Sequence, residues 1–261
     1  MAISGAAANP NMGFHSSPLI TALLALMNLR LGWWLGNPGV EGAHTWRQAG
    51  PRSATLRWLM EAAGRTNATT PWVQISDGGH YENLGLYEMV RRRVKIILVS
   101  DAGCDPKRSH EDLAEALRRI RIDLGVPITF DADAFTSPSH AVLGRICYDD
   151  VDAIPDSVPE VDRNGILIYL KASLCGDEPV ELRQYAAAHP KFPHDTTGDQ
   201  FFTEAQLESY RLLGFHTIMA IAGERDGRRQ PPPAKDQLGT FLEWVVQYTT
   251  HPRAAVKAPP R

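Results

Sequence analysis

The longest apolar stretch of the chain covers 18–35, and its apolar residues recur every three to four positions. Ser17 and Pro18 are residue types that favour the N-cap and the first turn of a helix. The pattern therefore predicts a helix over this stretch. Because Asn28 and Arg30 would be costly inside lipid, we favour a buried core helix over a membrane span, with an interfacial helix that touches lipid as the second interpretation.

Two short runs with β character, 72–75 and 95–99, flank a segment with helical character over 83–93. This spacing fits a right-handed parallel crossover, in which both strands lie in one sheet and their carboxyl-terminal loops open on the same edge. The predicted fold class is therefore α/β, with three layers around a mainly parallel central sheet.

The rest of the chain alternates helical and strand patterns. Ser109 is placed to cap an amphipathic helix that runs through Asp123. Thr203 and Gln206 form a capping box for a helix through Leu213. The remaining expected elements are strands over 128–130, 141–148 and 165–174 and a helix over 237–248.

The length of 261 residues fits one α/β domain, which we expect over 1–250, followed by a flexible Pro-rich tail over 251–261. Apolar and charged fractions of 43% and 22% are near globular averages and argue against wholesale disorder. A net charge of -3, with only a short basic cluster at Arg91–Arg93, argues against nucleic acid as the main partner.

The cysteines and the N-terminus bear on the compartment. Three widely spaced cysteines indicate neither a disulfide framework nor a zinc site and favour a reducing environment. The first eleven residues contain no basic region before an apolar core, so no secretory signal is expected. We expect a cytoplasmic protein or one bound peripherally to a membrane, with 18–35 as the contact.

The most informative segment is S-D-G-G-H-Y-E-N-L-G-L, over 76–86, which places an acid at the end of an apolar strand and before two glycines. The strand would hold Asp77 while its carboxylate faces a crevice, and Gly78 and Gly79 would let the chain turn sharply and a ligand approach. This geometry suits a catalytic base. An aspartate that only ties the turn together through backbone amides fits the same residues, and both interpretations stay open at this point.

This segment resembles the Asp-Gly-Gly signature of the patatin-like phospholipases, especially the larger members related to cytosolic phospholipase A2. Other passages are similar to the same family, so the resemblance covers most of the chain. They lie at 3–13, 31–38, 97–103, 189–193 and 200–211.

The resemblance implies a patatin-like fold and a lipid acyl hydrolase, of phospholipase or esterase type, that uses a Ser-Asp dyad. Asp77 would take the proton of a serine hydroxyl as that oxygen attacks an ester carbonyl, and water would later hydrolyse the acyl-enzyme. Gly78, Gly79 and His80 would shape the loop, and the Asn83 side chain would bond back to it. The mechanism implies no cofactor and no metal.

The sequence departs from the family at the nucleophile, because it contains no G-x-S-x-G elbow. Ser4 comes closest, but Ala2 and Ala6 stand where the elbow glycines belong. In the family the elbow precedes the Asp-Gly-Gly signature. We therefore expect a fold that is incomplete at its N-terminal side, with the serine on an upstream segment or a separate chain, and little turnover by this chain alone. A non-catalytic remnant that binds lipid or a partner is the alternative.

Other constellations are weaker. Asp77, His80 and Glu82, with Asp101, are possible hard-metal ligands, but their spacing matches no metal motif. A phosphate-binding turn is disfavoured because G-x-G-x-x-G is absent and the aspartate would repel an anion. Three residues of a Pro-broken loop have no nucleophile near them and are expected at the surface: His189, His194 and Asp195.

Overall fold

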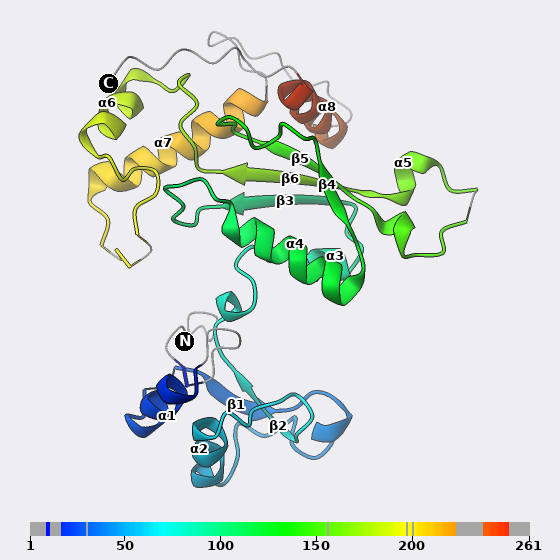
Figure 1. The fold of residues 1–261 in the computed structure, drawn as a ribbon, viewed down its shortest axis with the longest axis vertical. Helices are drawn as coiled ribbons and strands as arrows, with labels where there is room; N and C mark the ends of the chain where they lie inside the picture. Colours follow the sequence, from blue (N-terminus) through cyan, green and yellow to red (C-terminus); the bar gives the residue numbers. More distant parts are fainter. Residues whose placement is uncertain are drawn as a thin grey trace. The chain divides into compact units, whose positions relative to one another are not determined.

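The computed structural model describes residues 9–10, 17–29, 31–155, 157–196, 198–199, 201–222 and 237–250. The chain forms two compact units, Met1–Asn83 and Leu84–Arg261, where the sequence predicts one domain (Figure 1). Ser4, considered above as a nucleophile, and the tail predicted over 251–261 lie outside the described residues.

A two-stranded antiparallel sheet forms the centre of the first unit. In it β1 (Trp33–Gly36) pairs with β2 (Trp72–Ile75). The unit also contains helices and single 3-10 turns: α1 (Pro18–Leu26), η3 (Val40–Gly42), α2 (Ala54–Ala62) and η4 (Gly78–His80).

A buried carboxylate joins α2 to this small sheet. Glu61 is fully buried, and its carboxylate accepts hydrogen bonds from the Trp34 indole and from the Gln74 amide, the latter at 3.1 Å. The Gln74 amide also donates to Asn9 Oδ1 at 3.2 Å. Since a buried carboxylate is costly unless it is hydrogen-bonded, these donors hold the helix to both strands.

The predicted helix over 18–35 begins as expected and ends early. Ser17 Oγ accepts the N–H of Ile20 at 3.3 Å, which confirms the N-cap. The helix ends at Leu26, and Asn28 then adopts a left-handed conformation with φ 54°. A left-handed residue cannot continue a right-handed helix, and the chain goes on into β1.

The burial predicted for this helix is also wrong. Only Thr21 and Ala25 of α1 are buried, whereas Leu19 and Leu26 are 79% and 73% exposed. The large apolar residues of α1 other than Leu24 are therefore exposed. Over the described part of the chain, every helix is too short or too polar to cross a bilayer.

A four-stranded mixed sheet forms the centre of the second unit, in the order β3 (Ile96–Asp101), β6 (Gly165–Lys171), β5 (Val142–Ile146) and β4 (Ile128–Phe130). The β3–β6 pair is parallel, and the other two pairs are antiparallel. The prediction of an α/β fold is confirmed, but the prediction of a mainly parallel sheet is wrong.

The predicted crossover between 72–75 and 95–99 is also wrong, because β2 and β3 lie in separate sheets. The reason lies in the segment assigned to the long helix. Its last part forms β1, which provides β2 with an antiparallel partner. Two strands joined through a helix need not share a sheet when another strand is available to pair.

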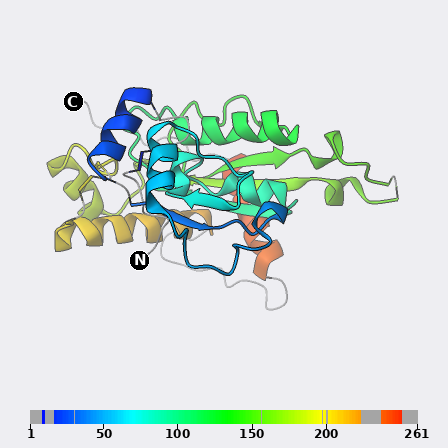
Figure 2. The same ribbon diagram turned by 90° about the horizontal axis from the view of Figure 1, so that it is seen from below.

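Helices cover both faces of the four-stranded sheet, so the second unit has the three predicted layers. Leu167 and Tyr169 of β6 pack on the side of α3 (Leu86–Arg91) and α4 (Glu111–Leu124). Ile168 and Leu170 pack on the side of α7 (Glu204–Ile221) and α8 (Gln237–Thr250). Figures 1 and 2 show α4 and α8 on opposite sides of the sheet. Burial on both faces explains the continuous apolar run of β6.

The other elements of this unit include η5 (Tyr148–Asp150), α5 (Glu160–Arg163) and α6 (Val180–Ala188). The cap predicted at Ser109 is wrong: α4 begins after His110, and the Ser109 hydroxyl donates to Asp105 at 2.9 Å. The cap predicted at Thr203 is confirmed, since its Oγ1 accepts the N–H of Gln206 at 3.2 Å.

Candidate functional site

Asp77 lies two residues beyond the end of β2, as the N-cap of η4. Its Oδ1 accepts the N–H of Gly79 at 2.8 Å, and its backbone carbonyl accepts the N–H of His80 at 3.2 Å. The side chain is half-buried. One carboxylate oxygen therefore ties the turn. This contact is the one expected of an aspartate that only holds the turn together.

The two glycines of the loop serve different purposes. A β-carbon on Gly79 would lie 2.6 Å from Asn83 Oδ1 and 3.3 Å from Asp77 Oδ1, so a side chain would collide with the Asn83 amide. The Asn83 amide thus lies beside the aspartate loop. A role of Asn83 in positioning this loop requires that location. A β-carbon on Gly78 would meet nothing within 4 Å, which leaves open space at that position.

The arginines that follow the loop in the sequence have carboxylate partners other than Asp77. The first two residues of Arg91–Arg93 each pair with Glu88 at 2.7 Å, and the third pairs with Asp152 at 2.6 Å. Hydrogen bonds from Arg91 and Arg92 lower the pKa of Glu88 to about 2. The basic cluster therefore neutralises other acids.

His80 belongs to the internal bonding of the loop, since its Nδ1 lies 3.2 Å from Ser76 Oγ. Among the described residues, the groups of side chains close enough to share a metal ion include neither Asp77, His80 nor Glu82. The interpretation of this loop as a metal site gains no support from the geometry.

A second polar cluster lies at the edge of the four-stranded sheet where β3 and β6 end. Asp101 and Lys171 are opposite each other on these parallel strands, and both are buried. Lys171 Nζ donates to Asp101 Oδ1 at 2.8 Å, and the Tyr169 hydroxyl donates to Oδ2 at 2.6 Å. The N–H of Gly103 also donates to Oδ1, at 2.8 Å. Asp101, suggested above as a metal ligand, is thus fully engaged by protein donors.

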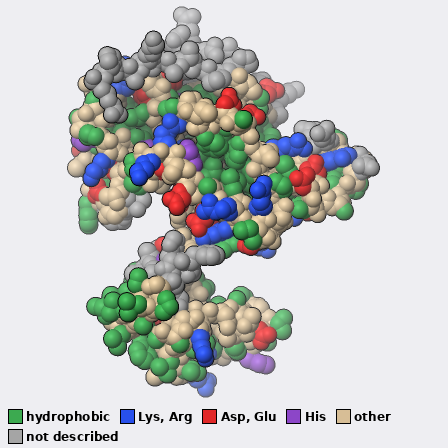
Figure 3. All heavy atoms as spheres, in the orientation of Figure 1, with side chains coloured by type: hydrophobic (Ala, Val, Ile, Leu, Met, Phe, Trp, Pro, Cys, Tyr) green, Lys and Arg blue, Asp and Glu red, His purple; other side chains and the backbone are tan. Residues whose placement is uncertain are grey.

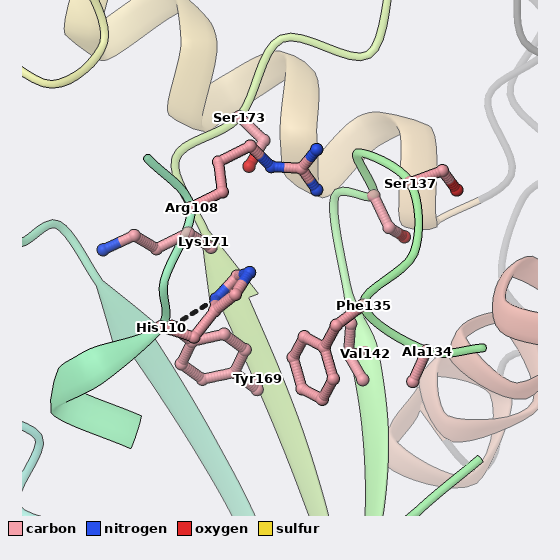
Figure 4. Close-up of a pocket in the computed structure, with 10 residues that line it drawn as sticks. Arg108, His110, Ala134, Phe135, Ser137, Val142, Tyr169, Lys171 and Ser173 are labelled. Atoms are coloured by element: carbon pink, nitrogen blue, oxygen red, sulfur yellow. Dashed lines mark hydrogen bonds between the residues drawn. The ribbon is translucent and has the colours of Figure 1, made fainter. Parts of the chain in front are cut away.

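A pocket opens beside this cluster (Figure 4). Arg108, His110 and Tyr169 lie on one side, and Phe135 and Ser137 lie on the other. The pocket is shallow and partly open to solvent, with room inside it for about one water molecule. Two further hydroxyl groups also line the pocket, those of Ser139 and Ser173.

Arg108 and His110 carry backbone strain and unused hydrogen-bonding atoms. Both have positive φ angles, 52° and 51°, which are uncommon for residues other than glycine. Arg108 Nε and His110 Nε2 are buried, and neither has a hydrogen-bond partner among the described residues. Burial lowers the pKa of His110, which favours the neutral imidazole. Strain combined with unmade hydrogen bonds is typical of ligand sites, and these groups suit a small polar ligand.

The sequence did not single out Arg108, His110, Tyr169 or Lys171. The available signal was a polar residue at the end of an apolar strand, which drew attention to Asp77 and applies equally to Lys171. The conformation of His110 carries little sequence signal, because only a small minority of histidines adopt a positive φ, even though they do so more often than most residues.

The Pro-broken loop does not form a catalytic relay. His189 is exposed and stacks on Tyr185 with the ring centroids 4.0 Å apart. His194 Nδ1 accepts the N–H of Asp105 at 3.4 Å, and Asp195 accepts the Tyr210 hydroxyl at 2.9 Å. These bonds anchor the loop.

Comparison of the chain with family models, curated proteins and solved structures finds no match. The resemblance to the patatin-like phospholipases therefore rests on the sequence motifs described above.

Proposed function

We propose that this chain supplies the aspartate of a Ser-Asp acyl hydrolase that acts on a lipid or another acyl ester. The observation that carries the proposal is the loop after β2. There Asp77 is held by the Gly79 amide, lies next to Asn83, and is followed by arginines that pair with other acids.

In the proposed reaction the two carboxylate oxygens divide the work. Oδ1 keeps its bond to the Gly79 amide and fixes the side chain, and Oδ2 accepts the proton of the serine hydroxyl. The serine oxygen attacks the ester carbonyl, and the proton passes to the departing alcohol. Asp77 then takes a proton from the water that attacks the acyl-enzyme and passes it to the serine oxygen as the bond between that oxygen and the acyl group breaks. No cofactor or metal takes part.

The nucleophile is the part that this sequence does not provide, because no G-x-S-x-G is present. The proposal places it on an upstream segment or a separate chain that completes the fold on the side of Met1–Asn83. The exposed apolar residues of α1 support a lipid substrate and a protein that is cytoplasmic or peripherally bound to a membrane.

A non-catalytic protein that binds lipid or a partner is the second candidate. The bond from Asp77 to the Gly79 amide favours it, since an aspartate that only ties a turn makes the same contact. The two candidates predict different results for one variant.

The test is to produce the chain together with the coding sequence upstream of it and to measure the hydrolysis of p-nitrophenyl esters. Asp77→Asn keeps the shape of the side chain but removes the proton acceptor, so turnover should fall by at least ~10². Asp131→Asn is the matched control, because Asp131 also follows a strand, β4, and is exposed. Its turnover should not change.

The non-catalytic candidate predicts no change in turnover per folded molecule for Asp77→Asn and little loss of stability, because the asparagine oxygen can still accept the Gly79 N–H. That result would overturn the proposal. The chain alone should show little turnover, and robust activity abolished by Ser4→Ala would move the nucleophile to Ser4.

A further inference from the structure

Three side chains with metal-binding atoms converge in the second unit. His140 lies two residues before β5, Asp177 lies in the loop between β6 and α6, and His216 lies in α7. Asp177 Oδ1 is 3.0 Å from His140 Nε2 and 3.3 Å from His216 Nε2. All three ligand atoms lie within 4.8 Å of one another. Segments far apart in the sequence are thus brought to one point by the fold.

Two imidazoles and one carboxylate form a recognised ligand set for divalent transition metals, above all zinc. Zinc bonds of about 2.1 Å in a tetrahedral arrangement separate neighbouring ligand atoms by roughly 3.4 Å. The two distances to Asp177 Oδ1, 3.0 Å and 3.3 Å, therefore need little adjustment for a shared ion. Ligands of this set come from three separate elements, so binding would join them.

The burial of the three groups fits a site with an open position. The side chain of His140 is 0% exposed, whereas those of Asp177 and His216 are 18% and 17% exposed. An ion bound here would have protein on one side and solvent access on the other. Three protein ligands with one exchangeable position are typical of zinc sites that hold a water or a substrate atom.

The surroundings hold the ligands in place. The Glu178 carboxylate accepts the N–H groups of Cys175 and Gly176, which fixes the loop on either side of Asp177. The N–H of His140 donates to the Tyr248 hydroxyl of α8 at 3.1 Å. Such outer contacts orient metal ligands and raise affinity.

We propose that His140, Asp177 and His216 bind one divalent transition-metal ion, with Zn²⁺ the best fit to the ligand set. The ion would join the start of β5, the β6–α6 loop and α7. The competing account is a metal-free hydrogen-bond network, in which both imidazoles donate to Asp177. The two accounts differ in what happens when a histidine is replaced by another hydrogen-bond donor.

The test uses the full chain, stripped with a chelator and titrated with Zn²⁺ by calorimetry and with Co²⁺ by visible absorption. The proposal predicts one equivalent of bound metal, a d–d spectrum of low coordination number, and a rise in melting temperature on binding. His216→Gln retains an N–H donor for Asp177 but is a poor metal ligand, so the affinity for the metal should fall by roughly 10² or more. Changes to residues that only support a ligand cost up to about 10², and loss of a ligand itself should cost at least as much. Asp177→Asn should act in the same direction.

His189→Ala is the matched control, because it removes an exposed imidazole from the same unit and should leave the affinity unchanged. Folding of each variant is checked by circular dichroism, so that loss of binding is not confused with loss of structure. A folded parent chain that takes up no metal would overturn the proposal, and so would equal affinity in His216→Gln and the parent. The hydrolase proposal does not bear on either outcome.

Discussion

Two residues of opposite charge, Asp101 and Lys171, end neighbouring strands of the four-stranded sheet, and only 2% and 4% of their side chains is exposed. Burial of two charges is costly, and it is tolerated here because each charge is hydrogen-bonded. Asp101 accepts from Lys171, Tyr169 and the Gly103 amide, and Lys171 also donates to the Gly103 carbonyl at 2.9 Å. The pair thereby orders the loop after β3, which leads to Arg108 and His110 in the lining of the pocket.

Replacement of Lys171 by methionine should be strongly destabilising. The variant keeps most of the side-chain volume but leaves the Asp101 carboxylate buried without a cation, a situation that typically costs about 3–5 kcal/mol. Urea denaturation measures the loss. Arg211→Met is the control, since Arg211 and Glu208 form an exposed pair and the unfolding midpoint should hardly move. Similar small shifts in both variants would show that Asp101 does not depend on its cation.

The histidines of the loops beside β3 predict how stability depends on pH. Burial lowers the pKa of both His110 and His194 below the ordinary value of 6.5. Asp101 and Asp105 raise these pKa values in part, and Arg108 and Lys171 lower them further. The folded state therefore disfavours protonation of both rings.

The sign follows from which state binds the proton first. Above the unfolded-state pKa of 6.5 both states are neutral and the stability is complete. As pH falls below that value the unfolded chain takes up protons first, so stability falls until pH passes the lower folded-state pKa. Urea unfolding over this pH range should show the decline, and His110→Gln should make it shallower, whereas His189→Gln should not. Stability that rises on mild acidification would contradict this.

At the scale of single elements, the sequence predicts those whose signals are local. The limits of β2 and β4 are predicted to the residue, and the N-caps at Ser17 and Thr203 are correct, because each depends on a few adjacent residues. The end of α1 was missed because Asn28 gives only a weak signal for its left-handed conformation. The cap of α4 was missed because Asp105 takes the Ser109 hydroxyl.

The first two helices allow a controlled test of capping. Both α1 and α2 have nine residues and a serine at the N-cap, but only Ser17 accepts a hydrogen bond from the helix. Ser17→Ala should therefore destabilise the first unit by about 1 kcal/mol, and Ser53→Ala should cost clearly less. Thermal unfolding followed by tryptophan fluorescence reports mainly on this unit, which contains every tryptophan of the chain except Trp244. Equal losses in the two variants would mean that the Ser17 bond contributes little.

At the scale of the whole molecule, strand order was the feature that the sequence could not provide. The strand β6 lies between β3 and β5, although more than sixty residues separate β3 from β6 and β5 precedes β6 in the chain. The choice depends on which strand is apolar on both faces and so can occupy the centre of the sheet. The aspartate loop was found without this knowledge because its motif is contiguous. The pocket and the His140 cluster were missed because the fold assembles them from distant segments.

The exposed hydrophobic side chains of the first unit are not scattered singly over its surface. Figure 3 shows them gathered over α1. Contiguous exposed apolar surface marks an interaction site. The exposed residues of and just after this helix are Leu19, Ile20, Leu23, Leu26, Met27 and Leu29. No acidic residue lies in the first turn of α1 and no basic residue in its last, so the helix can approach the apolar part of a membrane at low cost.

We predict that the chain binds neutral phosphatidylcholine vesicles through α1. Burial of one leucine side chain contributes about 1.5–3 kcal/mol, so the double replacement Leu19→Glu with Leu26→Glu should weaken co-sedimentation at least ~10-fold. Ile122→Glu is the control, because Ile122 of α4 is also 79% exposed but lies among charged residues of the second unit. A neutral lipid surface removes the contribution of charge attraction, so that the assay reports apolar contact alone. Binding that survives the double replacement would show that the lipid contact lies elsewhere in the chain. Binding that Ile122→Glu weakens as much would show that α1 makes no specific contact. Either result would remove the support that α1 gives to a lipid substrate.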